Sequence, residues 1–274
     1  MGAPSNILCE SSLLRFCSEN ALRLKIVVWL FAILSPLVIS PERAEAEEQS
    51  CRDQTENGFA YRVCRFDPAT RTIRIFNRNA DGDVYGGFEA LRSQLWQQRL
   101  ILTFAVNGGM YHSDLSPVGL FVDYGMTRKT AETADGWGNF YLKPNGVFFL
   151  KDGHAGVLET GQFETQKIEA DFATQSGPML VIDGVLHPKF LPTSDSLKIR
   201  NGVGIDASGQ VVFVLSKDPV RFYDMAAFFR DRLGAANALY LDGTISSLAE
   251  PMAGRIDRAY PLGPIIAVVD QRPN

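Results

Sequence analysis

The sequence Leu-Asp-Gly-Thr-Ile-Ser-Ser, which follows an apolar run near the C-terminus, combines a carboxylate, a glycine and hydroxyl groups. Asp242 supplies a hydrogen-bond acceptor at the end of the expected strand, and Gly243 permits close approach of the backbone. We interpret Asp242 as catalytic and Gly243, Ser246 and Ser247 as substrate-binding. The alternative is a turn-capping aspartate bonded to the amides of Gly243 and Thr244, with the serines bonded to the loop backbone.

A second polar motif, Asn-Gly-Gly-Met-Tyr-His, begins at Asn107 directly after the apolar run 100–106. The Asn107 side chain offers a donor and an acceptor, which makes it a catalytic candidate. Gly108 and Gly109 let the backbone close on a sugar hydroxyl or an oxyanion, although Asn-Gly is also the commonest tight hairpin turn. His112 is a candidate substrate-binding residue or proton carrier, and the alternative is a plain surface histidine.

Two further strand ends carry groups that suit an anionic substrate. Ser176 and Gly177 precede a proline and a short apolar strand, and they are candidate substrate-binding residues. Arg200 precedes a glycine-rich strand, and its guanidinium group matches the geometry of phosphate oxygens and keeps its charge. The alternative is a surface arginine paired with Asp195 or Asp206.

Taken in order, these motifs resemble the phosphodiester glycosidase family, whose best-known member is the catalytic domain of the lysosomal uncovering enzyme. The resemblance covers residues 59–270 and is strongest to small bacterial, exported members. The family's Asn-Gly-Gly turn begins here at Asn107, and its Gly-Pro element begins at Gly177. The family's arginine before a glycine-rich strand corresponds to Arg200, and the aspartate of its Leu-Asp-Gly signature corresponds to Asp242.

The resemblance implies an exported hydrolase that cleaves the glycosidic bond of a sugar-1-phosphate diester or a related envelope glycoside. Such chemistry needs a carboxylate to stabilise the developing sugar cation, a role that suits Asp242, and a positive charge such as Arg200 for the phosphate. Thr244 and Ile245 stand where the family usually has glycines. A non-catalytic carbohydrate-binding or envelope-assembly protein on the same fold is therefore the alternative.

Other chemistries find little support. The chain has no CxxC pair, HExxH helix, Walker loop or Gly-x-Ser-x-Gly elbow, so we expect no metal or other cofactor. A calcium or magnesium ion held by Asp242, Asp206 and backbone carbonyls is the alternative. The formal net charge of −4 disfavours a nucleic-acid partner and leaves a carbohydrate or sugar phosphate as the expected one.

The N-terminus has the pattern of an export signal. Arg15, Arg23 and Lys25 precede the apolar stretch 26–39, and a small-x-small Ala-Glu-Ala pattern ends at residue 46. We predict that residues 1–46 form a signal peptide and that the protein is periplasmic or secreted. The alternative is an uncleaved anchor, through which the protein would contact the membrane.

Cleavage would leave Cys51 and Cys64 as the two remaining cysteines in an oxidising compartment, so we expect them to pair. Closing so short a loop is worth on the order of 3 kcal/mol in the chain-entropy treatment. The alternative is two unpaired cysteines in a frayed segment. We expect a mobile N-terminal segment at 47–58 and a single phosphodiester glycosidase-like domain at 59–274.

The apolar patterns predict an α+β fold, with a mixed or antiparallel β-sheet core and few helices. Helical spacing indicates one helix through Phe88, Leu91 and Leu95, and a second over 222–233 that ends at Gly234. We further expect a hairpin between 61–66 and 72–77, hairpin turns at Pro144-Asn145-Gly146, Asp183-Gly184 and Ala207-Ser208-Gly209, and strands over 100–106, 238–241 and 265–269.

Overall fold

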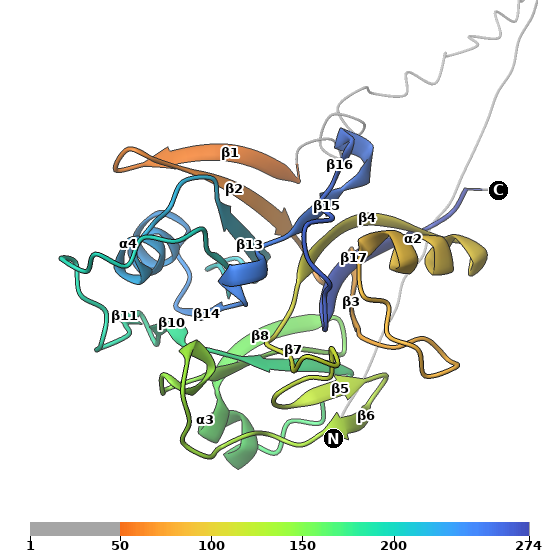
Figure 1. The fold of residues 1–274 in the computed structure, drawn as a ribbon, viewed down its shortest axis with the longest axis horizontal. Helices are drawn as coiled ribbons and strands as arrows, with labels where there is room; N and C mark the ends of the chain where they lie inside the picture. Colours follow the sequence, from red (N-terminus) through yellow and green to blue (C-terminus); the bar gives the residue numbers. More distant parts are fainter. Residues whose placement is uncertain (1–49, 274) are drawn as a thin grey trace, which may run out of the picture. The chain divides into compact units, whose positions relative to one another are not determined.

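The computed structural model describes residues 50–273 (Figure 1). The described residues form one compact unit, which contains all of the hydrophobic cores described below. The predicted signal peptide at 1–46 lies outside the described residues. Within 50–273, no helix has both the length and the apolar character needed to cross a membrane.

The first sheet has seven strands in the order β1-β2-β13-β12-β14-β10-β11, and all of its pairings are antiparallel. Its central strands are buried on both faces, which explains the unbroken apolar run Val-Val-Phe-Val-Leu in β13. The strands are β1 (Cys51–Glu56), β2 (Phe59–Phe66), β10 (Met179–Ile182), β11 (Val185–Leu186), β12 (Asn201–Ile205), β13 (Val211–Ser216) and β14 (Asn237–Tyr240).

Two five-stranded antiparallel sheets complete the β structure, in the orders β16-β15-β4-β17-β3 and β6-β5-β9-β7-β8. The second sheet contains β3 (Thr72–Phe76), β4 (Leu100–Asn107), β15 (Leu248–Glu250), β16 (Arg255–Ile256) and β17 (Ile265–Gln271). The third contains β5 (Phe121–Asp123), β6 (Met126–Lys129), β7 (Gly146–Lys151), β8 (His154–Glu159) and β9 (Phe172–Ser176).

The three sheets share one central core, and helices cover their outer faces (Figure 1). The helix α4 (Phe222–Ala227) continues as η2 (Phe228–Arg232), packs on the first sheet and is followed by Gly234 with a φ of 68°. The helix α2 (Phe88–Gln97) packs on the second sheet and α3 (Thr160–Thr165) on the third. The α+β prediction is confirmed, and both predicted helices are present.

Two predicted hairpins are wrong. The strands β2 and β3 lie in different sheets, because both edges of β2 are occupied by β1 and β13. The turn at residues 67–70 therefore sends the chain from the first sheet to the second. Likewise, the residues before Pro144 form the 3-10 helix η1 (Asn139–Tyr141) in place of a strand. The hairpins at 183–184 and 207–209 are confirmed.

The N-terminal segment is more ordered than expected. Residues 51–56 of the segment predicted to be mobile form β1, which pairs with β2 along its whole length. Cys51 lies directly opposite Cys64 in this pairing, and the two form the predicted disulfide. The alternative of two unpaired cysteines in a frayed segment is therefore wrong. Residues 47–49 lie outside the described part of the chain.

Candidate active site

Asn107 joins three chain segments that are far apart in the sequence. It ends β4 and is 0% exposed. Its Nδ2 donates a hydrogen bond to the backbone oxygen of Asp242 at 2.9 Å, and its Oδ1 accepts from Nδ2 of Asn201 at 2.7 Å and from the backbone N–H of Ser247 at 3.0 Å. Asn107 and Asp242, which are 135 positions apart in the sequence, are therefore in direct contact.

Through these bonds the side chain of Asn107 holds the strand ends together. The neighbouring glycines also serve packing. The N–H of Gly108 donates to the oxygen of Pro264 at 2.7 Å. A Cβ on Gly109 would lie 2.2 Å from the oxygen of Gln175, so only glycine fits there. The Asn-Gly pair does not form a hairpin turn, since β4 pairs with β15 and β17.

Asp242 follows β14 and begins the 3-10 helix η3 (Gly243–Ile245). Its Oδ1 accepts a hydrogen bond from the N–H of Thr244 at 3.2 Å, whereas the N–H of Gly243 donates to the Tyr240 hydroxyl at 2.9 Å. The alternative of a turn-capping aspartate is thus correct for the amide of Thr244 and wrong for that of Gly243. Burial raises the pKa of the half-buried Asp242 carboxyl above its usual value, and the Thr244 bond only partly offsets this.

Two tyrosines lie near this carboxyl. Burial raises the pKa of Tyr111 to about 12, and the charge of Asp242 contributes to the rise. Burial also raises the pKa of Tyr240, where the positive charge of Arg200 acts in the opposite direction and that of Asp242 in the same one. The charge of Asp242 therefore acts on both tyrosines, and that of Arg200 acts on Tyr240.

Arg200 is held rigidly beneath the surface at 2% exposure. Its Nε donates to the oxygen of Val220 at 2.9 Å and its Nη2 to the oxygen of Ser196 at 3.1 Å. The guanidinium carbon lies 3.6 Å from the ring centroid of Phe222, which is a close cation–π contact. Burial lowers the pKa of Arg200, and the neighbouring Tyr240 partly opposes this.

No carboxylate among residues 50–273 forms an ion pair with Arg200. The alternative pairings with Asp195 and Asp206 are therefore wrong, and Asp206 instead contacts Arg65 at 3.7 Å. A buried guanidinium without a counter-ion is costly, because the interior solvates a charge poorly. Arg200 is consequently suited to bind an anionic ligand.

A cavity of about 450 Å³ opens over Arg200. Gly243 and Thr244 line it directly, and Asp242 precedes them in the chain. Lys198 provides a second cation and Tyr240 a hydroxyl, so the lining combines positive charge with an aromatic surface. The remaining lining residues are Asn139, Ser196, Ile199 and Phe222. We treat this cavity and the adjoining Asp242 as the candidate active site.

The predicted serines face the protein. Ser246 Oγ donates to the oxygen of Gly243 at 2.8 Å, and Ser247 Oγ donates to the oxygen of Ile245 at 2.6 Å. Both hydroxyls therefore stabilise the loop backbone, as the alternative interpretation held. Ser176 is fully buried in β9, and its Oγ has no hydrogen-bond partner there.

Gly177 and His112 lie outside the cavity lining. A Cβ on Gly177 would approach the oxygen of Phe140 to 2.8 Å, so this glycine allows η1 to pack closely. His112 is exposed and lines a separate cavity of about 690 Å³ with Tyr85 and Tyr124. Among the predicted residues, the structure thus gathers Asp242, Arg200 and Gly243 at one place.

The alternative of an ion shared by Asp206 and Asp242 does not fit the strand geometry. The oxygen of Asn201, at the start of β12, accepts from the N–H of Leu241, whereas Ile205 at the other end pairs with Asn237. Asp242 and Asp206 therefore lie at opposite ends of β12. Asp206 Oδ1 is moreover bonded within its own turn, to the backbone N–H groups of residues 208 and 210.

Sequence reasoning missed most of the residues that line the cavity, and also Asn201 and Tyr111. Tyr240 and Phe222 were assigned to apolar patterns, yet both line the cavity. In the sequence, the only indication of a site role for Tyr240 was its position two residues before Asp242, and for Phe222 its position at the start of a helix. Asn201 follows Arg200 directly, and Tyr111 follows the Asn-Gly-Gly turn. Their roles depend on contacts with residues distant in sequence, which no local pattern reveals.

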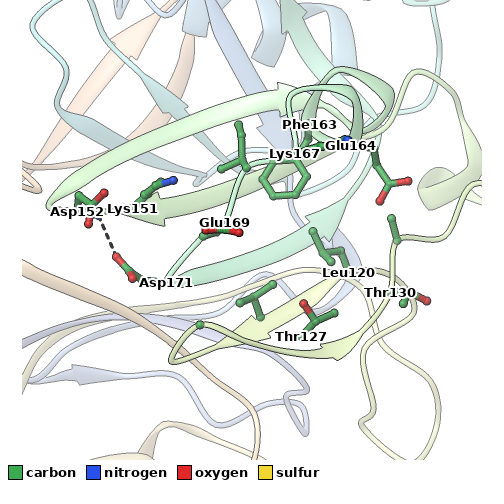
Figure 2. A pocket seen from close by; sticks show the side chains of 15 residues that line it. Leu120, Thr127, Thr130, Lys151, Asp152, Phe163, Glu164, Lys167, Glu169 and Asp171 are labelled. Atoms are coloured by element: carbon green, nitrogen blue, oxygen red, sulfur yellow. Dashed lines mark hydrogen bonds between the residues drawn. The ribbon is translucent and has the colours of Figure 1, made fainter.

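A groove on the third sheet is a competing site (Figure 2). Its volume is about 760 Å³, and it lies between α3 and the β5–β6 hairpin. Apolar side chains such as Leu120 and Phe163 belong to the core beneath it, and charged side chains form its rim. Figure 2 shows the bond from the N–H of Asp152 to Asp171 at this rim. None of the predicted site residues lines it.

The sequence model of the phosphodiester glycosidase family matches residues 102–261. The chain belongs to this family. The matched range contains Asn107, Arg200 and Asp242. A relative from Escherichia coli K12, the uncharacterised protein YigE, is 36% identical over 223 residues, which cover 81% of this chain and 86% of that protein.

Solved structures show the same fold at low sequence identity. The catalytic domain of zebrafish N-acetylglucosamine-1-phosphodiester alpha-N-acetylglucosaminidase, auto-inhibited by its pro-peptide, superposes with a TM-score of 0.54 at 14% identity, covering 80% of this chain and 81% of that one. A Burkholderia pseudomallei K96243 protein described as exported gives a TM-score of 0.51 at 12% identity, covering 77% and 74%. The chain therefore shares its fold with these two proteins.

Proposed function

We propose that this protein hydrolyses the glycosidic bond of a sugar-1-phosphate diester or a related envelope glycoside. The observation that carries the proposal is Arg200, a buried guanidinium that faces the cavity without a carboxylate partner among the described residues. A phosphate group would supply the missing negative charge and accept two parallel hydrogen bonds from one guanidinium. Lys198 in the same lining adds to the positive potential.

Asp242 is the acidic group in this proposal. The bond between the anomeric carbon and the phosphate oxygen breaks, and that oxygen leaves on the phosphate monoester. The ionised Asp242 carboxylate stabilises the positive charge that develops on the sugar. Water then supplies a hydroxyl to the anomeric carbon, and its proton passes to solvent. Partial burial strengthens the electrostatic effect of Asp242, because fewer water molecules screen the charge.

Relatives support the substrate class. The family is one of phosphodiester glycosidases, and the zebrafish neighbour acts by name on an N-acetylglucosamine-1-phosphodiester. The phosphate is the part of such a substrate that an ordinary glycoside lacks. The proposal therefore makes phosphate recognition by Arg200 the feature that separates this protein from a general glycosidase.

The test compares two chromogenic substrates, a phosphodiester of a sugar 1-phosphate and the glycoside of the same sugar without phosphate. We expect turnover of the first alone if the substrate is a phosphodiester, whereas turnover of the second would indicate the related glycoside. Arg200→Lys keeps the charge but loses the planar donors, so KM for the phosphodiester should rise about 10–100-fold. Arg65→Lys, whose side chain contacts Asp206, is the matched control. Binding of sugar phosphate without turnover would instead support the non-catalytic carbohydrate-binding protein.

We also propose that the protein is exported and begins at Glu47 after cleavage. The Cys51–Cys64 disulfide supports an oxidising compartment, and one structural neighbour is described as exported. The intact mass of protein recovered from the periplasm tests both points. A mass that includes residues 1–46 would show an uncleaved segment, and two free thiols would contradict the oxidising location.

A further inference from the structure

Trp137 is the most exposed large apolar side chain of the described residues, at 98% exposure. It lies in the loop 130–138, which connects β6 to η1. Asn139, two residues further on, lines the candidate active-site cavity. A fully exposed indole so near in sequence to a cavity-lining residue is unusual, and exposed apolar groups that gather with polar neighbours mark binding surfaces.

A second loop, which also borders the cavity, carries three more exposed apolar side chains. Leu191, Leu197 and Ile199 are exposed on residues 187–200, and Ile199 lines the cavity. The two loops are neighbours, because Asn139 at the end of the first loop and Ile199 in the second line the same cavity. We refer to Trp137, Leu191, Leu197 and Ile199 as the apolar rim.

We propose that the apolar rim inserts into the surface of an anionic lipid bilayer, and that the substrate is a sugar phosphodiester whose second ester group is a lipid. This inference rests on the proposed function, since it specifies the leaving group of the same reaction. The cavity of about 450 Å³ is at the small end of the roughly 300–1,000 Å³ typical of ligand pockets. The sugar and phosphate occupy it, and the lipid chain extends past Ile199 along the rim.

The charges around the rim favour a bilayer over a protein partner. Lys189 and Lys198 are exposed beside the apolar side chains, and lysine with tryptophan and leucine is the composition of interfacial membrane contacts. Two carboxylates lie nearby. Asp135 is paired with Lys143 at 2.8 Å, and in the second loop Lys189 and Lys198 outnumber Asp195. The local positive charge would attract anionic headgroups although the whole chain carries −4.

The structure offers a matched pair of tryptophans for the test. Trp96 is also exposed, at 56%, but it lies on α2, which packs on the second sheet. Protein beginning at Glu47 is mixed with vesicles that contain phosphatidylglycerol and sedimented. We expect Trp137→Ser to weaken vesicle partitioning about tenfold or more, because an inserted indole is lost, and Trp96→Ser to leave it within about twofold. Thermal melting verifies that both variants are folded.

The same vesicles carry a synthetic lipid-linked sugar phosphodiester, and a short-chain soluble analogue is assayed in parallel. The ratio of the two rates should fall with Trp137→Ser and stay unchanged with Trp96→Ser. Absence of vesicle binding by the wild type, or equal losses in both variants, overturns the inference and favours a protein partner. Failure to hydrolyse the soluble analogue, with vesicle binding intact, overturns the proposed function instead.

Discussion

Replacing Asp242 by asparagine separates its chemical role from its structural one. The amide is nearly isosteric, and its oxygen can still accept the Thr244 hydrogen bond that the carboxylate accepts at 3.2 Å. The loop η3 therefore keeps its N-terminal cap in Asp242→Asn. What the variant loses is the negative charge beside the cavity.

The size of the effect follows from the position of the charge. A carboxylate about 4 Å from a developing positive charge interacts with it by about 4 kcal/mol at an effective dielectric constant of about 20. Removing such a contribution lowers the rate by about 10²–10³-fold. We therefore expect kcat of Asp242→Asn on a sugar 1-phosphodiester to fall by that factor.

Stability should change in the opposite direction. Burial raises the folded-state pKa of Asp242, so its contribution to stability is fully present below its unfolded pKa and is lost as pH rises through the folded pKa. At pH 7 the ionised carboxylate is thus less favourable in the fold than a neutral group. Asp242→Asn should melt at or above the wild-type temperature at pH 7 and lose this advantage near pH 4. A destabilised but fully active variant would refute the catalytic assignment.

Three further predictions concern rate and stability. The rate should fall below neutral pH as Asp242 gains a proton, at a pH above the usual aspartate range, and a pH–rate profile without this limb would contradict its role. Gly109→Ala should destabilise the fold by about 3 kcal/mol or more in urea unfolding because of the clash at Gln175. Gly87→Ala has open space around it and should cost only the N-cap preference of glycine over alanine, about 1 kcal/mol. Replacing Cys51 and Cys64 together by serine should cost about 3 kcal/mol, and a smaller loss would argue against the loop-closure account.

Local patterns in the sequence predicted the elements that local physics determines. The helix through Phe88, Leu91 and Leu95 is present as α2, because apolar residues that recur with the helical period of 3.6 residues form one face that packs on the core. The turn at Asp183-Gly184 likewise fixes its own hairpin, with positive φ at both residues. Asn107 and Asp242 could be selected as candidates because both follow apolar strands, and in the structure a hydrogen bond joins them.

Partners that are distant in the sequence explain the failures. The alternation in β2 and β3 is correct for strands, but pairing between them depends on which edges are free, and β13 occupies that edge of β2. The surroundings of Arg200 could not be predicted for the same reason. Its neighbour Phe222 comes from a helix whose apolar face indicates only burial.

The last prediction concerns the buried side chain of Asn107, which is hydrogen-bonded to three other residues. Asn107→Asp keeps the acceptor for Asn201 and Ser247 but replaces the donor to the Asp242 oxygen. A buried carboxyl facing a carbonyl binds a proton tightly, which restores the donor at low pH. Its raised folded-state pKa means that stability is retained near pH 4 and lost as pH rises, by about 1–3 kcal/mol at pH 7.

Asn79→Asp is the control, because Asn79 Oδ1 accepts from the N–H groups of residues 81 and 83, and a carboxylate can do the same. Urea unfolding at both pH values decides, since equal losses at pH 4 and pH 7 would mean that the Asn107 donor does not hold the Asp242 strand end in place.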